Sequence, residues 1–240
     1  MSGTLSVVST LRTARERARS EVTAEILATA RRHLAEHGAA GLSLRAVARD
    51  LGLVSSAVYR YFENRDALLT ALIVDAYDSL GEAAEASLAR SARRPSRQRW
   101  VAAAEAIRGW ALARPHEYAL LYGSPVPGYV APADTVGPGT RVSLALVQVV
   151  RDAHRRGQLD PARAVSAGGS AMAAARDLHR LAGLIELDVP AASLLAFLLA
   201  WTQLFGLVSF ELFGQTHGLI EDHAAFFRAA ATAMAAGIGL

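Results

Sequence analysis

The chain has 240 residues, of which 52% are hydrophobic and 20% charged. It is long enough to bury a hydrophobic core in one large domain or in two smaller ones. It contains no cysteine, which excludes disulfides, thiolate catalysis and cysteine-ligated zinc and fits a reducing compartment. All 25 basic residues are arginine, so the sequence pI near 9.7 overstates a formal net charge of only +3.

The distribution of charge along the chain is more informative than its total. Residues 1–65 hold ten Arg and six acidic residues, a net charge of +4. Residues 66–240 hold fifteen Arg and sixteen acidic residues, a net charge of −1. The positive charge therefore lies in the N-terminal quarter, where it is available to neutralise phosphates of a nucleic acid.

Residues 1–19 mix Ser and Thr with four Arg, and we expect a flexible basic arm that is either solvated or in contact with DNA phosphates or a minor groove. A first helix is predicted from about Ser20 to His37, and Gly38 and Gly41 then interrupt the chain. Its apolar residues recur at four-residue steps, as Val22, Ile26, Ala30 and Leu34.

Residues 42–69 predict two short helices, followed at once by the start of a longer one. The first carries a buried stripe at helical spacing, formed by Leu44, Val47, Ala48 and Leu51. Ser43 stands where a side-chain oxygen caps the free N–H groups of this helix. Gly52 suits the left-handed residue just past the helix end.

The second short helix has one apolar edge and one polar side. Val58 and Phe62 supply the buried edge. The side chains expected to face outward are Ser55, Ser56, Tyr59 and Arg60. A short helix that is anchored from behind and presents Ser, Tyr and Arg suits the DNA major groove.

Further helices are predicted along the rest of the chain, and no alternating strand pattern is seen. Asn64 is a predicted N-cap. The fold class is all-α, with about nine to ten helices. Beyond Asn64 they are expected over 65–90, from Trp100 to Pro115, over 116–122, up to Arg156, from Pro161 to Ile185, over 190–213 and over 222–236, with an irregular Pro- and Gly-rich loop at 123–139.

Residues 194–213 are apolar enough to resemble a membrane span, with Glu211 as their single charge. Thr202, Gln203 and Ser209 would be costly in lipid, and no Arg cluster flanks the segment. We therefore expect a buried helix and no membrane association. The N-terminus lacks the pattern of a secretory signal, so we expect a cytoplasmic protein.

From residue 23 to residue 75 the chain resembles the TetR (tetracycline-repressor-like) family of transcriptional regulators. The resemblance rests on TAEILATARRHLAEHG, LSLRAVARDLGL, VYRYF and RDALL, in that order. It implies a helix-turn-helix DNA-binding domain at 20–65 and a helical ligand-binding and dimerisation domain at 66–240. The features at Tyr118, 125–129 and 201–214 are similar to an actinobacterial-type sub-group.

The resemblance also implies roles for individual residues. Tyr61 and Arg65 stand where His and Lys are more common, and both replacements keep a phosphate donor. Val54 and Ser56 depart further, since the pattern more often shows Ser and Gly there. Arg45 and Arg49 fit a solvated face as well as they fit DNA contact. Expected phosphate contacts are Ser43, Tyr59, Tyr61 and Arg65, and residues expected to face base edges are Ser55, Ser56, Ala57 and Arg60.

The expected partners are double-stranded DNA with a near-palindromic operator, a second copy of the chain, and an unknown small-molecule effector. The helices 190–213 and 222–236 are the candidate dimer interface. We expect a repressor that a small, largely apolar ligand releases from its operator. The residues chosen as a ligand pocket are aromatic side chains and one histidine, namely Trp110, Tyr118, Tyr122, Tyr129, His179, Trp201 and Phe205.

Two alternatives remain open at this point. An enzyme would need more than the sequence offers, because Ser170 in GGSAM lacks the G-x-S-x-G frame. His33 and His37 have metal-ligand spacing but no third ligand nearby, so we expect surface histidines, no metal and no cofactor. The other alternative is a helical ligand-binding protein without DNA function, which a salt-dependent shift of its own promoter fragment would exclude.

Overall fold

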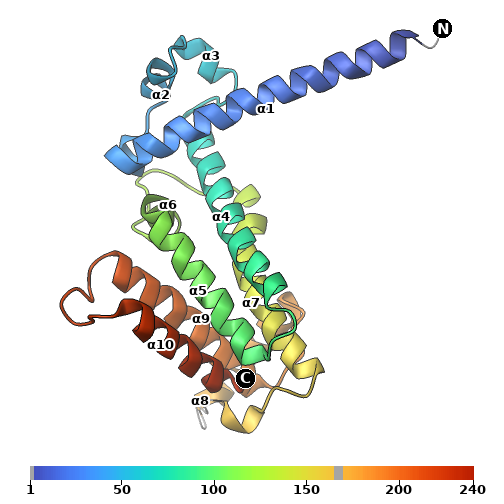
Figure 1. The fold of residues 1–240 in the computed structure, drawn as a ribbon, viewed down its shortest axis with the longest axis vertical. Helices are drawn as coiled ribbons and strands as arrows, with labels where there is room; N and C mark the ends of the chain where they lie inside the picture. Colours follow the sequence, from blue (N-terminus) through green and yellow to red (C-terminus); the bar gives the residue numbers. More distant parts are fainter. Residues whose placement is uncertain (1–2, 165–169) are drawn as a thin grey trace. The chain divides into compact units, whose positions relative to one another are not determined.

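The computed structural model describes residues 3–164 and 170–240, with side chains described over 15–164 and 176–240. Within these ranges the chain forms ten α-helices, three short 3-10 helices and no strand, which confirms the all-α fold class (Figure 1). The GGSAM motif, with Ser170, lies where side chains are not described.

The chain divides into two compact units. The first comprises Met1–Asp75 and Ala119–Thr135, and the second comprises Ala76–Tyr118 and Val136–Leu240. The division predicted from sequence, at residue 65, differs because the first turns of α4 (Arg65–Arg90) belong to the first unit. The segment 119–135 also belongs to the first unit. Within that unit, the hydroxyl of Tyr129 lies 2.9 Å from the hydroxyl of Thr70 in α4, at hydrogen-bonding distance.

The first unit is built on α1 (Gly3–His37), whose apolar stripe at four-residue steps is buried at Ile26, Ala30 and Leu34. Against it packs α2 (Leu44–Asp50), which in turn packs on α3 (Ser55–Tyr59). The 3-10 helices Ala39–Gly41 and Ala133–Thr135 complete this unit. Its helix start near Ser20 was wrongly predicted: residues 3–19, expected as an arm, continue the helix.

The second unit contains the remaining helices. Its core helix α5 (Ser96–Ala113) packs on α7, α9 and α10, and α8 packs on α9. The other bounds are α6 (Pro115–Tyr122, shared with the first unit), α7 (Val136–Arg155), α8 (Ser170–Leu184), α9 (Ala191–Leu212), α10 (His223–Ile238) and the 3-10 helix Pro161–Arg163. The loop predicted at 123–139 ends earlier than expected, because Gly137, Pro138 and Gly139 form the first turn of α7, where a proline costs no hydrogen bond.

The amphipathic pattern of α7 shows why this helix forms where it does. Its buried residues fall at three- and four-residue steps, so one face is apolar and the opposite face is solvated. The stripe comprises Val142, Ala145, Leu146, Val149, Val150 and Ala153. The one buried charge on this helix, Asp152, accepts a hydrogen bond of 2.9 Å from Arg99 of α5. Burial would raise the pKa of Asp152, but hydrogen bonds from Arg99, Arg155 and Gln148 outweigh it and leave the pKa below its ordinary value.

Candidate nucleic-acid interface

The connection between α2 and α3 is fixed by the backbone. Gly52 follows the helix end with φ of 66°, in the left-handed region that the sequence predicted. The N–H of Gly52 donates to the carbonyl of Arg49 at 3.0 Å, and the N–H of Leu53 donates to the carbonyl of Ala48 at 2.9 Å. This pair of bonds is the Schellman arrangement, which satisfies the last carbonyls of α2 and sets the direction in which α3 leaves.

Both helices that flank the predicted sites have capped starts. The N–H of Ala46 donates to the Ser43 Oγ at 3.4 Å, so Ser43 caps α2 and its hydroxyl proton stays available to another acceptor. The N–H of Ala67 donates to Asn64 Oδ1 at 2.8 Å, so Asn64 caps α4. Both predicted caps are confirmed. Arg45, in the first turn of α2, has an exposed side chain.

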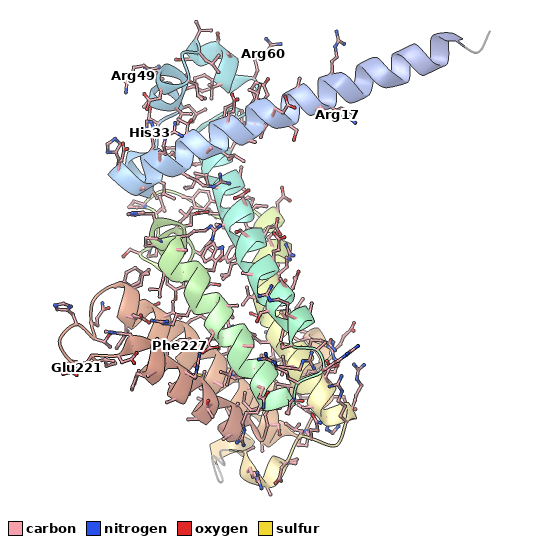
Figure 2. All side chains as sticks on the ribbon, in the orientation of Figure 1. Arg17, His33, Arg49, Arg60, Glu221 and Phe227 are labelled. Carbon is pink, nitrogen blue, oxygen red and sulfur yellow. The ribbon has the colours of Figure 1, made fainter. Side chains whose placement is uncertain are left out.

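The short helix α3 has the two faces expected of it. Val58 is fully buried and Phe62, just after the helix, is 8% exposed, so both anchor the inner face. Val54 precedes the helix and offers no side-chain cap. The expected base-facing and contact residues lie on the other side: Ser56, Tyr59 and Arg60 are exposed, and Ser55 and Ala57 are half-buried. In Figure 2 the labelled side chains of Arg49 and Arg60 project outward from this helix pair.

Tyr61 is half-buried and lies against the N-terminal helix. The guanidinium of Arg19 in α1 sits over the Tyr61 ring, 5.6 Å from its centroid. A cation in this position is attracted by the ring face, so α1 helps to hold Tyr61 in place. Sequence reasoning missed this role of Arg19, since the two residues are far apart along the chain.

Arg65 lies in a setting that the sequence did not predict. Its Nη2 donates to the carbonyl of Ala39 at 2.8 Å and reaches the carbonyl of Ala40 at 3.5 Å. Its Nη1 lies 3.6 Å from an oxygen of Asp66. The guanidinium thus ties α4 to the turn that follows α1, and a phosphate contact by Arg65 would have to use the donors that remain.

The prediction of a surface histidine is wrong for His33, which is 4% exposed, although His37 is exposed as predicted. Nε2 of His33 lies 2.7 Å from Oδ2 of Asp50, which joins α1 to the end of α2. This hydrogen bond holds the pKa of Asp50 below its ordinary value. Among the described residues no group of three potential metal ligands occurs.

The seven residues predicted as a ligand pocket are divided between the two units. Tyr122 and Tyr129 belong to the first unit, and the other five belong to the second. Tyr118 is fully buried, and its hydroxyl lies 2.9 Å from Ser209 Oγ and 3.1 Å from the carbonyl of Phe205; burial raises its pKa. The indole N–H of Trp110 donates to Ser79 Oγ at 2.9 Å. His179 is exposed and lines a cavity of about 610 Å³ between α8 and α9.

Among the described residues of the second unit, four buried side-chain polar groups lack a hydrogen-bond partner. They are the indole N–H groups of Trp100 and Trp201, the hydroxyl of Ser193 and Nε of Arg99. On α9, Ser193, Phe197, Trp201 and Phe205 recur every four residues and so form one ridge. Phe197 meets the ring of Trp100 edge to face at 6.2 Å, and Trp201 meets Phe205 at 5.9 Å. Sequence reasoning selected Trp201 and Phe205 but missed the others, although the four-residue spacing on α9 was available as a signal.

The helices predicted as the dimer interface share an apolar groove. A cavity of about 570 Å³ lies between α9 and α10, lined by Ala196, Ala200 and Gly206 among others. Leu199 and Phe210, which also line it, are 45% and 55% exposed. Among the described residues, α9 is long and apolar enough to cross a membrane by length and composition alone, and 44% of its most apolar window is buried inside the protein.

Comparison with known proteins places both parts of the chain in one family. Residues 26–72 match the bacterial regulatory proteins of the tetR family, and residues 100–234 match the tetracyclin repressor-like C-terminal domain. HTH-type transcriptional regulators Rv1816 of Mycobacterium tuberculosis and Mb1846 of Mycobacterium bovis are each 53% identical over 129 residues, 53% of this chain and 55% of theirs. The chain thus spans about half the length of the curated relatives it matches.

Solved structures extend the likeness over most of the chain. SCO4313, described as a regulatory protein, is 34% identical with a TM-score of 0.73, covering 91% of this chain and 97% of that one. A protein of unknown function from Rhodococcus sp. RHA1 is 25% identical with a TM-score of 0.69, covering 91% and 95%. Because the C-terminal match alone covers more than half of the residues, the chain belongs to the TetR family of bacterial regulatory proteins.

Proposed function

We propose that this protein is a sequence-specific DNA-binding transcriptional regulator whose helix α3 enters the major groove. The observation that carries the proposal is the polar outer face of α3, with Ser56, Tyr59 and Arg60 exposed while Val58 anchors the helix from behind. A rigid short helix with small and hydrogen-bonding side chains can approach base edges closely. The relatives with 53% identity carry the description HTH-type transcriptional regulator, which supports the same function.

The residues of this face divide into two roles. Ser55, Ser56, Ala57 and Arg60 would face base edges and select the sequence. Ser43, Tyr59 and Tyr61 would contact phosphates and fix the position of the domain without reading sequence. Arg65 would add to the positioning chiefly by holding the turn at Ala39, since that is where its guanidinium donates.

A symmetric dimer would place two such helices on a near-palindromic operator. The α9–α10 groove supports this assembly, because its small residues let helices approach closely and its exposed Leu199 and Phe210 would leave water on association. Leu199 and Phe210 lie on an apolar face, and burying this face against a second copy of the chain would stabilise the dimer.

The second unit would bind a small, largely apolar effector that releases the repressor from DNA. The aromatic ridge of α9 and the unpartnered N–H groups of Trp100 and Trp201 support such a ligand, one that offers acceptor oxygens to these donors. Helix α4 belongs to both units and is the proposed route between the sites. Release requires that the effector bind the DNA-incompetent state more tightly, since equal affinity for both states shifts nothing.

A regulator of this kind needs no cofactor and no catalytic step, and it works in the cytoplasm where its DNA lies. The test is to select bound duplexes from genomic fragments and then to compare Tyr61→Phe with the wild-type protein on several sequences. Loss of one phosphate hydrogen bond should weaken binding to all of them by a similar factor, about fivefold per contact. A change in preference among sequences, with no general weakening, would contradict the assigned role.

A further inference from the structure

The N-terminal part of α1 carries positive charge beyond the compact part of the first unit. The helix continues from Ser20 back to Gly3, past the helices that it packs against (Figure 1). From Arg15 to Ser20 every side chain is exposed, so this part of the helix contributes nothing to the core. Figure 2 labels Arg17 on this projecting segment.

The helical register assigns the arginines of this segment to different faces. Arg15 and Arg19 are four residues apart and therefore lie on one face, one turn from each other. Because the Arg19 guanidinium sits over the Tyr61 ring, that face is turned toward the side of the unit on which Tyr61 lies. Arg17 is about 200° from both around the helix axis and points the other way.

Arg15 and Arg19 place two like charges one turn apart on an exposed part of the helix. Like charges one turn apart repel each other, and an exposed helix end gains nothing from core packing. A row of phosphates along this face would turn the repulsion into attraction. Tyr61 is a proposed phosphate contact, so the DNA backbone would pass close to this face of α1.

We propose that Arg15 and Arg19 form a second phosphate-contacting row, so that the N-terminal segment of α1 extends the interface along the DNA backbone next to Tyr61. The inference rests on the proposed DNA-binding function. It assigns Arg15 to direct phosphate contact and assigns Arg19 to contact as well as to support of the Tyr61 ring. Arg17, on the opposite face, has no part in it.

The test compares Arg15→Ala with Arg17→Ala, two variants that remove the same charge from exposed positions of the same helix. The binding constant for a duplex from the DNA upstream of the protein's own gene is measured by fluorescence anisotropy over a range of salt concentrations. Arg15→Ala should reduce the slope of log K against log salt by about 0.9 per protomer, while Arg17→Ala should leave the slope unchanged.

The outcomes separate this inference from the proposed function. Equal reductions of the salt slope in both variants would mean that the segment acts as a diffuse positive charge. No reduction in either variant would mean that the segment is solvated. Each of these results would overturn the phosphate-contacting row but would leave the DNA binding of the wild-type protein unaffected. A wild-type protein that binds no duplex even at low salt would overturn the proposed function together with the inference.

Discussion

Gly52 sets the angle between α2 and α3, the two helices of the candidate interface. Replacing it with alanine should lower the stability of this turn, because the backbone of Gly52 is in the left-handed region. At φ of 66° an L-residue is strained by roughly 1–2 kcal/mol. No heavy atom lies within 4 Å of a Cβ built at this position, so Gly52→Ala meets no clash. The smaller entropy of the unfolded chain returns about 0.4–1 kcal/mol, which leaves a net loss of about 1 kcal/mol.

The loss should appear locally, because Gly52 holds the two hydrogen bonds that close α2. The amide of Leu53 donates to Ala48 across this turn, and its hydrogen exchange reports opening of the turn directly. A loss of about 1 kcal/mol makes that amide exchange about fivefold faster. Gly52→Asn should recover most of the difference, since Asn tolerates the left-handed region.

Gly109 provides the control, because it is a helical glycine of α5 with open space around its Cβ position. Gly109→Ala should leave the exchange of the Leu53 amide unchanged and stabilise the second unit by roughly 0.5–1 kcal/mol. Wild-type exchange of the Leu53 amide in Gly52→Ala would refute the reasoning, since it would mean that the turn carries no backbone strain.

Three further predictions concern other parts of the molecule. The pKa of Asp50 is lower in the folded protein than in the unfolded chain, so ionised Asp50 stabilises the fold above the unfolded-state pKa, and this stabilisation is lost as the pH falls through the folded-state pKa. The urea unfolding midpoints of the wild type and of Asp50→Asn should therefore converge as the pH falls below about 4. A difference between the two midpoints that stays constant with pH would contradict this. Trp100→Phe should lower the free energy of urea unfolding less than Trp110→Phe does, because only Trp110 loses a hydrogen bond, which is worth about 1 kcal/mol. Equal losses of unfolding free energy in the two variants would count against an unpartnered N–H at Trp100. If the proposed dimer forms through the α9–α10 face, Phe210→Glu should be monomeric in sedimentation at micromolar concentration, whereas Val130→Glu, exposed in the first unit, should sediment as the wild-type dimer. A Phe210→Glu variant that remains dimeric would exclude this face.

The features that sequence reasoning predicted well depend on neighbours along the chain. The buried stripe of α2, the left-handed Gly52 and the caps at Ser43 and Asn64 each involve residues within a few positions of one another. Helical periodicity and capping chemistry act over that range, so the sequence contains the information directly.

The features that it missed depend on residues far apart along the chain. His33 is buried because Asp50 meets it from another helix, and Arg65 donates to Ala39 rather than standing free for a phosphate. The start of α1 was placed too late because Arg-rich, Ser-rich segments lack an apolar stripe, which is the usual signal of a helix. The unpartnered N–H of Trp100 could not be predicted from the sequence, because it is a property of tertiary packing.

The outer face of α3 is proposed to read the DNA sequence. To test this role, a duplex selected from genomic fragments and a duplex of scrambled sequence are each titrated with wild-type protein and with Arg60→Ala. The wild-type protein should bind the selected duplex more tightly than the scrambled one, in a salt-dependent way. Arg60→Ala should stay folded but lose about 1–3 kcal/mol of that preference. An unchanged preference in Arg60→Ala, or no binding by the wild-type protein at low salt, would contradict this role.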